Sequence, residues 1–292
     1  MAQSSRRAAL NAPGPLFVDD TCIDCDLCRQ LAPEVFGRAQ GQSIVVHQPE
    51  TQRDRERAAV ALVTCPTASI GGAAKPEVDW AVDHLPEPIS GAQEVYFCGY
   101  AAEASFGAAS YFIRRPQGNV LVDSPRAAKP LMERLEALGG VRFMFLTHRD
   151  DVADHEAYRR RFGCERILHE ADVSAGTREI ERRVVGSAPV ELAPGLLAIP
   201  TPGHTRGSQV LLWERHLFTG DHLWGTDADD GLEAGREVCW FSWAEQTRSM
   251  ERLLAHDFEW VLPGHGHRHQ RDIAHMKHEL RRLVTEMRSE LR

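Results

Sequence analysis

Residues Val141–His155 read VRFMFLTHRDDVADH. The apolar run that opens this stretch is interrupted only by Arg142 and has the length and composition of a buried strand. After Thr147, the segment 148–155 holds two histidines and three aspartates. Proteins with α/β and αββα folds place their chemistry just past the carboxyl ends of strands, and imidazole with carboxylate suits zinc, iron or manganese. A helix N-terminus would also explain the aspartates, so the stretch alone leaves both interpretations open.

The composition is that of an ordinary globular protein. The chain has 292 residues, which is room for about two domains, and 42% of them are hydrophobic and 26% charged. The net charge of −8 and the lack of a long basic run argue against nucleic-acid binding. No apolar run approaches the ~20 residues of a membrane helix, and the start, MAQSSRRAAL, lacks the apolar segment of a secretory signal. We therefore expect a cytoplasmic protein that binds neither nucleic acid nor membrane.

Four of the seven cysteines form a pattern near the N-terminus. Cys22, Cys25 and Cys28 are separated by gaps of two residues, and Cys65 follows later with a proline after it. A tight loop can direct three thiolates to one iron–sulfur cluster, which a distant fourth cysteine completes. Four-cysteine zinc sites usually combine two Cys-x-x-Cys knuckles instead, and disulfides are disfavoured without an export signal. The three isolated cysteines are expected to be structural thiols: Cys98, Cys164 and Cys239.

The stretches TCIDCDLCRQLAPEVF and ALVTCPTASI resemble a single-cluster [4Fe–4S] ferredoxin domain over about residues 16–72. The resemblance implies that the cluster is bound by Cys22, Cys25, Cys28 and Cys65. Because Cys25 is retained and Asp26 replaces no ligand, a four-iron cluster is favoured over a three-iron one. The residues between the ligands predict a helical stretch at 29–36, a strand at 43–47 and a helix at 50–63.

The chain divides into four predicted segments. We expect a flexible N-terminus over residues 1–15, a small ferredoxin-like α+β domain over 16–75, a linker over 76–92 and a second domain over 93–292. The linker is rich in Pro, Gly and Ala, and its prolines should interrupt any long element. Apolar residues on one face predict an amphipathic C-terminal helix that packs within its own domain.

Five predicted strand ends in the second domain carry a histidine or an aspartate. They are Asp123, His148, His204, Asp221 and His265. A glycine beside each of the last three allows its turn to bend sharply without a Cβ clash. Coincidence is a poor explanation when independent strands deliver such side chains to one edge of a sheet. The pattern therefore predicts a metal site.

The order and spacing of these motifs resemble the metallo-β-lactamase fold over roughly residues 93–270, above all in Thr-Pro-Gly-His-Thr at 201–205 and Gly-Asp at 220–221. The resemblance implies an αββα sandwich. It also implies that His148 opens an H-x-H-x-D-H motif, that Asp221 bridges two metals, and that His204 and His265 are further ligands. Asp123 matches an acidic residue that is usually structural in the family. Three histidines without a counterpart are expected to be solvated loop residues: His222, His267 and His269.

The segment 148–155 departs from the family motif. Asp150 stands where the family has its second histidine, and Asp154–His155 follows two residues later than the expected Asp-His pair. Alternatively, Asp151 takes the role of the family's aspartate. If a helix begins near Asp151, then residues 151, 154 and 155 share one face and can reach a metal or orient its ligands. The predicted metal ligands are therefore His148, Asp150, Asp151, Asp154, His155, His204, Asp221 and His265, with catalytic roles for Asp154, His155 and Asp221.

These patterns predict an enzyme with a [4Fe–4S] cluster and one or two divalent metals. In the leading interpretation it is a hydrolase in which metal-bound hydroxide attacks an ester or thioester-like bond of a small molecule. The extra carboxylates shift the metal preference from zinc toward iron or manganese. The alternative is an iron-dependent redox enzyme, similar to flavodiiron proteins or persulfide dioxygenases, that receives electrons through the ferredoxin domain from a redox partner protein. A third interpretation is a non-enzymatic electron carrier with a vestigial second domain.

Overall fold

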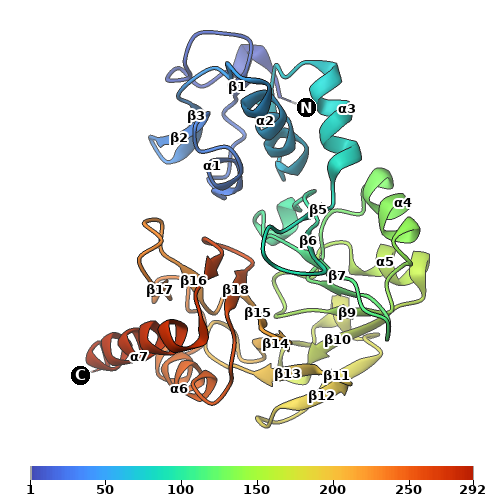
Figure 1. Cartoon of the computed structure of the whole chain (residues 1–292), viewed down its shortest axis with the longest axis vertical. Helices are drawn as coiled ribbons and strands as arrows, with labels where there is room; N and C mark the ends of the chain where they lie inside the picture. Colours follow the sequence, from blue (N-terminus) through green and yellow to red (C-terminus); the bar gives the residue numbers. More distant parts are fainter. Residues whose placement is uncertain (1, 292) are drawn as a thin grey trace.

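The computed structural model describes residues 2–291 and contains a small N-terminal domain, a connecting helix and a larger sandwich (Figure 1). In the larger domain two sheets pack face to face between two layers of helices, which confirms the predicted αββα class. Within the described residues, no helix combines the length and the apolar character that crossing a membrane requires.

The small domain is built from short strands and two helices around the cysteine loop. The strands form two antiparallel pairs, β1 (Phe17–Val18) with β4 (Ile70–Gly71), and β2 (Phe36–Ala39) with β3 (Gln42–Val45). The helices are α1 (Leu27–Leu31) and α2 (Gln52–Thr64). A capping box of Thr51 and Asp54 starts α2, which ends just before Cys65. The predicted helix at 29–36 is too long, because Phe36 already pairs in the β2–β3 hairpin.

Two segments that we expected to be irregular are ordered. The side chain of Asn11 donates to the Val18 carbonyl (2.8 Å) and accepts from the Val45 amide (2.9 Å). These bonds hold the N-terminal segment, with its 3-10 helix η1 (Ser4–Arg6), against the small domain. The predicted linker contains α3 (Lys75–His84), in which Pro76 occupies the first turn, where a missing N–H needs no partner.

The two sheets of the larger domain have the strand orders β11-β10-β9-β8-β7-β6-β5 and β12-β13-β14-β15-β18-β19. The first consists of β5 (Glu87–Pro88), β6 (Val95–Phe97), β7 (Tyr111–Ile113), β8 (Val120–Val122), β9 (Phe143–Phe145), β10 (Glu165–His169) and β11 (Arg182–Val184). The second consists of β12 (Val190–Ala193), β13 (Leu196–Pro200), β14 (Gln209–Trp213), β15 (His216–Gly220), β18 (Trp260–Pro263) and β19 (His269–Gln270). A separate ribbon joins β16 (Trp224–Gly225) to β17 (Leu232–Glu233).

Helices cover the outer faces of both sheets (Figure 1). On the first sheet lie α4 (Lys129–Ala137) and α5 (His155–Phe162), and on the second lie α6 (Trp243–Leu253) and α7 (Ile273–Ser289). Three short 3-10 helices lie in loops: η2 (Glu103–Ser105), η3 (Glu170–Asp172) and η4 (Ala175–Thr177). The apolar face of α7 packs within its own domain, as predicted, and its core residues are at most 5% exposed: Met276, Leu280, Leu283, Val284 and Met287.

Parallel pairing brings the predicted site residues to one edge of the sandwich. β8, β9 and β10 run parallel to one another in the first sheet, and β15 runs parallel to β18 in the second. Because the carboxyl ends of parallel strands meet at the same edge, the residues that follow these strands come together. Tyr111 of β7 joins the two sheets near this edge, since its hydroxyl donates to the Pro263 carbonyl (2.7 Å).

Candidate metal centre and iron–sulfur site

A hydrogen-bond chain orients His148 at the end of β9. The hydroxyl and the amide of Thr147 both donate to Asp123 Oδ1, at 3.0 and 2.8 Å. With its hydrogen committed to Asp123, this hydroxyl is left to accept from His148 Nδ1, 3.0 Å away. His148 therefore carries its proton on Nδ1 and presents the lone pair of Nε2 to the cavity. Asp123 has the structural place that the family resemblance implied.

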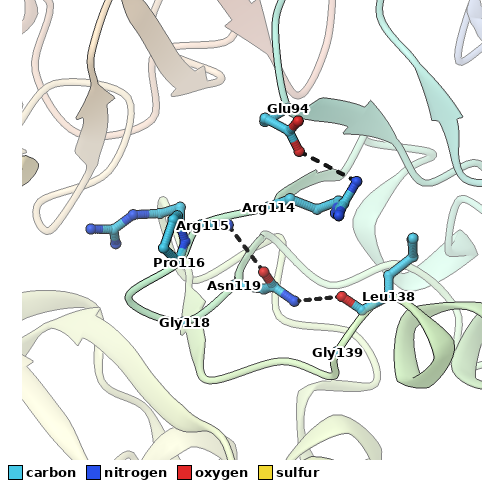
Figure 2. Close-up of a pocket in the computed structure, with 8 residues that line it drawn as sticks. All are labelled: Glu94, Arg114, Arg115, Pro116, Gly118, Asn119, Leu138 and Gly139. Carbon is cyan, nitrogen blue, oxygen red and sulfur yellow. Dashed lines mark hydrogen bonds and ion pairs between the residues drawn. The ribbon is translucent and has the colours of Figure 1, made fainter.

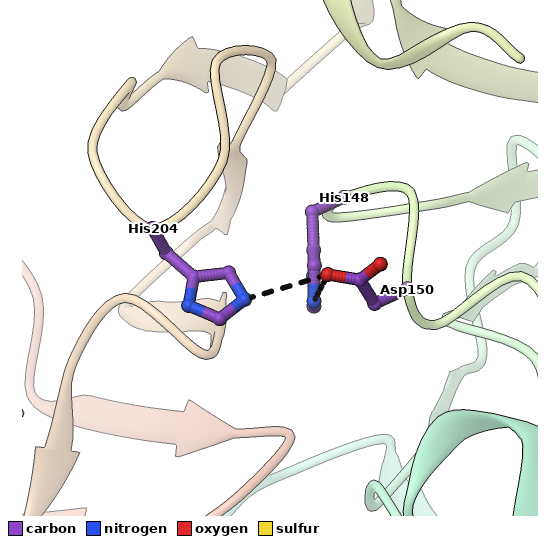
Figure 3. Close-up of side chains that lie close together, drawn as sticks. All are labelled: His148, Asp150 and His204. Carbon is purple, nitrogen blue, oxygen red and sulfur yellow. Dashed lines mark ion pairs between the residues drawn. The ribbon is translucent and has the colours of Figure 1, made fainter. Parts of the chain in front are cut away.

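His204 is oriented in the same way from the turn after β13. Its Nδ1 donates to the Val238 carbonyl (2.6 Å), so its Nε2 carries a free lone pair. The rings of His148 and His204 lie 4.7 Å apart and nearly perpendicular. Both Nε2 atoms are buried and have no hydrogen-bond partner. Figure 3 shows the Asp150 carboxylate directed toward both, with Oδ2 at 3.9 Å from His148 Nε2 and 3.8 Å from His204 Nε2.

Two further carboxylates complete the cluster. Asp221 Oδ2 lies 3.7 Å from His148 Nε2 and 3.8 Å from His204 Nε2. Asp151 Oδ2 is buried without a hydrogen-bond partner, 3.9 Å from His148 Nδ1. Gly264 permits this approach, because a Cβ at that position would lie 3.0 Å from oxygens of both Asp151 and Asp221. A larger residue in the turn after β18 would therefore force one of these carboxylates to shift.

Burial and the charges of neighbouring groups shift the pKa values of several groups at this cluster. Burial lowers the pKa of His148 to about 4, so its imidazole is neutral at neutral pH. Burial, with Asp221 close by, raises the pKa of Asp151 well above its ordinary value. Burial also raises the pKa of Asp123, to about 7. A bound cation would offset the repulsion among these carboxylates.

The residues therefore fit a divalent cation. Within the described chain, two overlapping groups each place one ligand atom per residue within 4.8 Å of the others: His148, Asp150 and His204, and His148, Asp151 and Asp221. Neutral imidazole and carboxylate are the donor types that zinc, iron and manganese accept. The unpartnered Nε2 atoms of His148 and His204 are the atoms through which a histidine would bind such an ion.

His265 lies beside this cluster, but other groups occupy both of its ring nitrogens. Nδ1 is 2.8 Å from Asp221 Oδ1, and Nε2 is 3.3 Å from the carbonyl oxygen of Phe106. Burial would lower the pKa of His265, but the adjacent Asp221 carboxylate outweighs it and raises that pKa above its ordinary value. In this arrangement His265 donates to Asp221, and its predicted role as a metal ligand stays a prediction.

The structure does not bring Asp154 and His155 to the cluster. Asp154 accepts from the Ala127 amide (2.8 Å), and His155 Nδ1 lies 2.9 Å from a guanidinium nitrogen of Arg166. We expected a helix beginning near Asp151, but α5 begins at His155, so residues 151 and 155 do not share a helical face. The predicted roles of Asp154 and His155 as metal ligands and catalytic residues stay predictions.

The three histidines that we expected to be solvated are at least partly buried. His222 is 1% exposed, and burial lowers its pKa to about 3. His269 lies between Asp229 (3.0 Å) and Glu279 (2.6 Å) with its side chain fully buried. His267 is half-buried and faces Asp26 of the small domain at 3.7 Å. Long-range contacts that no local pattern reveals explain these differences.

The four cysteines of the small domain converge on one small cavity. Cys22 and Cys65 accept hydrogen bonds on sulfur from the amides of Asp24 (3.4 Å) and Ser69 (3.3 Å), an arrangement common around iron–sulfur clusters. Burial raises the pKa values of Cys25 and Cys28 to about 12, so that without a metal these thiols stay protonated. The residues fit the cluster that the sequence predicted, with all four sulfurs at one place.

The cysteine loop contacts the metal-site domain directly. Gly107 has a φ of +85°, and a Cβ there would lie 2.7 Å from Cys25 Cβ and 2.8 Å from its Sγ. The Ala101 amide donates to the carbonyl of Thr64, which precedes Cys65 (3.0 Å). No sequence pattern marked this contact, because its partners are far apart along the chain.

The metal centre opens into a cavity of about 760 Å³ that both domains line. The small domain contributes Asp24 and Asp26, for which the sequence predicted no functional role. The larger domain contributes aromatic residues that we also did not single out, Phe106, Trp224 and Trp240. Candidate ligands at the base of the cavity are Asp150, Asp151, His204 and Asp221.

A second cavity, of about 590 Å³, lies at the turn between β7 and β8 (Figure 2). Arg114 faces Glu94 across it at 3.5 Å, and Asn119 accepts from the Arg115 amide (3.1 Å) while donating to the Leu138 carbonyl (3.0 Å). None of the candidate ligands lines it. Its hydrogen bonds shape the turn, and it is separate from the metal centre.

Comparisons with known proteins support the assignment of both domains. Residues 18–72 match the family described as the 4Fe-4S single cluster domain of Ferredoxin I. A curated hydroxyacylglutathione hydrolase from Anaeromyxobacter dehalogenans is 38% identical over 96 residues, which are 30% of this chain and 36% of that protein. The chain thus spans about a third of the length of the curated relative that it matches.

Solved structures share the fold of the larger domain at low identity. VMB-1 has a TM-score of 0.51 and 17% identity, covering 67% of this chain and 94% of its own. A metallo-β-lactamase from Hirschia baltica has a TM-score of 0.50 and 18% identity, covering 65% of this chain and 94% of its own. The chain therefore joins a 4Fe–4S single-cluster ferredoxin domain to a domain with the metallo-β-lactamase fold.

Proposed function

We propose that this protein is a metal-dependent hydrolase that cleaves an ester or thioester bond. The observation that carries the proposal is the pair of buried, unpartnered Nε2 atoms of His148 and His204, with the carboxylates of Asp150 and Asp221 beside them at the base of a cavity. A divalent metal bound there would lower the pKa of a coordinated water and polarise a substrate carbonyl.

The residues around the ligands have distinct roles in this proposal. Thr147 and the Val238 carbonyl keep His148 and His204 in the tautomers that leave Nε2 free. Asp150, whose side chain is 49% exposed and lies within 4 Å of both Nε2 atoms, accepts a proton from the attacking water. His265 fixes the Asp221 carboxylate through its Nδ1. The hydrolase name of the partly matching curated relative supports this reaction class.

The test is metal analysis and ester hydrolysis with the anaerobically purified chain. In His204→Ala, we expect loss of the metal beyond the cluster's iron and loss of hydrolysis of a 4-nitrophenyl ester. The visible absorbance of the cluster should remain. The control is His278→Ala, on the exposed face of α7. If His204→Ala keeps both the additional metal and the hydrolysis, the proposal is wrong.

A second candidate is an iron-dependent redox enzyme that receives electrons through the ferredoxin domain. The contact of Cys25 with Gly107 favours it, because the neighbouring Phe106 carbonyl is 3.3 Å from His265 Nε2, and His265 contacts Asp221. The carboxylate-rich ligand set also suits iron better than a set of three histidines would. The buried, preoriented histidines argue against the third interpretation, a vestigial second domain.

Metal identity separates the two candidates. Two results would support the redox enzyme. One is iron beyond the cluster's own, and the other is reoxidation of the dithionite-reduced cluster by added oxygen that is slower in His204→Ala. Zinc as the additional metal, with ester hydrolysis that dithionite leaves unchanged, would support the hydrolase.

A further inference from the structure

The cavity above the metal centre has a wall of exposed aromatic side chains. Trp240 is 63% exposed and Phe106 is 56% exposed, and both line the cavity with Trp224. The amide of Trp240 donates to the His204 carbonyl (3.0 Å), and its indole lies 6.2 Å from the His204 imidazole. If the reacting bond of a substrate lies at the metal centre, an apolar group next to that bond would therefore contact this indole. Leaving such rings in water is unfavourable unless a ligand covers them.

Acidic residues of the ferredoxin domain also line the cavity and form what we call its acidic wall. Asp24 and Asp26 lie on either side of Cys25, and both have a left-handed backbone conformation, with φ values of 60° and 72°. Arg29 holds them in place: its Nη1 donates to Asp24 (2.8 Å), and its other contacts include Asp26 and Ser43. Nε and Nη1 of Arg29 are thus engaged with these partners, and Arg29 is not among the residues that line the cavity.

Apart from the metal centre and His265 beside it, the described residues of the lining offer no cationic side chain to an anionic ligand. Its ionisable side chains are the imidazoles of His204 and His265 and the carboxylates of Asp24, Asp26, Asp150, Asp151, Asp221 and Glu237. Among the described residues, no lysine or arginine lines the cavity. A carboxylate in the outer part of the cavity would lose water and face other carboxylates without a partner. An alkyl group there would gain by leaving water.

We propose that this cavity selects an uncharged ester or thioester with an apolar acyl group and rejects acyl groups that end in a carboxylate. The inference rests on the proposed hydrolase function and adds its substrate class. It also gives the ferredoxin domain a second role, as one wall of the substrate site. The aromatic wall binds the acyl chain, and the acidic wall with Glu237 excludes anions.

The experiment compares two esters that differ only at the chain end, 4-nitrophenyl hexanoate and mono-4-nitrophenyl adipate. We expect kcat/KM to be at least about tenfold higher for the hexanoate, as for a site that leaves one charged group unpaired. Trp240→Ala should lower kcat/KM for the hexanoate more than for the adipate. Asp26→Lys and Glu237→Lys should each raise kcat/KM for the adipate. The control for added charge is Asp20→Lys, at a residue that does not line the cavity.

A binding measurement keeps this inference separate from the proposed reaction. Hexananilide and the anilide of adipic acid resist cleavage, and quenching of tryptophan fluorescence reports their binding. If hexananilide binds more tightly than the adipic anilide, and Trp240→Ala weakens that binding, the inference is supported. If neither ester is cleaved, the hydrolase function is overturned, but this binding result still stands. Equal use or equal binding of the charged and uncharged compounds, or no effect of Trp240→Ala on the preference, would overturn the inference while leaving hydrolysis intact.

Discussion

The two candidate centres of this molecule are assembled in different ways. Three of the four cysteines lie within residues 22–28, on one loop and the first turn of α1, and Cys65 follows the end of α2. The metal centre instead collects its groups from turns after β9, β13 and β15, between residues 148 and 221, with His265 beside them after β18. A centre built from one loop can be recognised residue by residue. A centre built from several strand ends can be recognised only if the end of each strand is predicted correctly.

Burial acts differently on the two sets of ligands. At the cysteine site it raises the pKa values of Cys25 and Cys28 to about 12, so the ligands ionise only when iron binds. At the metal centre it lowers the pKa of His148 to about 4, so this imidazole is already in its metal-binding form. The cysteine site should therefore depend on its metal more strongly for folding than the metal centre does.

The largest expected effect is that of Cys25→Ala. Removing one thiolate from a four-cysteine site should abolish the cluster and lower the melting temperature of the small domain, whose core surrounds the cysteines. Acid-labile sulfide, visible absorbance and thermal unfolding measure this effect. Cys98→Ala, at a buried cysteine outside the cavity, should keep the cluster. A Cys25→Ala protein with unchanged sulfide content would contradict the cluster assignment.

The next effect concerns the orientation of His148. Asp123→Asn weakens the chain from Asp123 through Thr147 to His148, and we expect the affinity of the metal centre to fall by about 10–100-fold. Competition with a chelator measures this affinity, with the cluster absorbance as an internal reference. Asp154→Asn is the matched comparison, because its carboxylate accepts from Ala127 and not from a metal-centre group. An equal loss in Asp154→Asn would restore the sequence-based ligand assignment.

A smaller effect is expected where the two domains meet. Gly107→Ala places a Cβ 2.7 Å from Cys25 Cβ, so the cysteine loop or the Gly107 segment must move. We expect a destabilisation of about 1–3 kcal/mol, measured by urea unfolding, and faster loss of the cluster in air. Gly41→Ala is a close control, since Gly41 also has a positive φ but no atom within 4 Å of the added Cβ. Equal effects of both substitutions would mean that backbone strain, and not the contact, sets the cost.

The sequence predicted the position of a side chain correctly where that side chain directly follows an apolar strand. It placed Asp123, His148, His204 and Asp221 at one edge because each follows an apolar run that forms a strand in the structure. It misplaced the start of α5, which begins at His155 and not near Asp151, after Asp154 has bonded to the Ala127 amide. The ligand roles of Asp154 and His155 stay predictions. The sequence also did not predict the cavity walls. The exposure of Trp240 and the position of Asp26 follow from how the two domains pack.

The smallest expected effect, on stability, concerns the residues that His155 contacts in place of the metal centre. Arg166, 4% exposed, contacts His155 Nδ1 (2.9 Å) and donates to both oxygens of Glu181 (3.0 Å each). Burial would raise the pKa of Glu181, but the hydrogen bonds from Arg166 outweigh it and lower that pKa to about 2. Because this value is below the ordinary 4.5, the pair stabilises the fold fully above pH 4.5 and progressively less as the pH falls toward 2.

Glu181→Gln should therefore reduce the free energy of unfolding at pH 7 and make its decline between pH 4.5 and about 2 shallower than in the unaltered protein. Urea unfolding across this range measures both changes, and Glu179→Gln, at a carboxylate whose side chain is 79% exposed, is the control. The metal content of Glu181→Gln should stay unchanged, because His155 belongs to the Arg166–Glu181 group in this structure. A loss of metal in this variant would contradict this assignment, because it would couple His155 and the Arg166–Glu181 group to the metal centre.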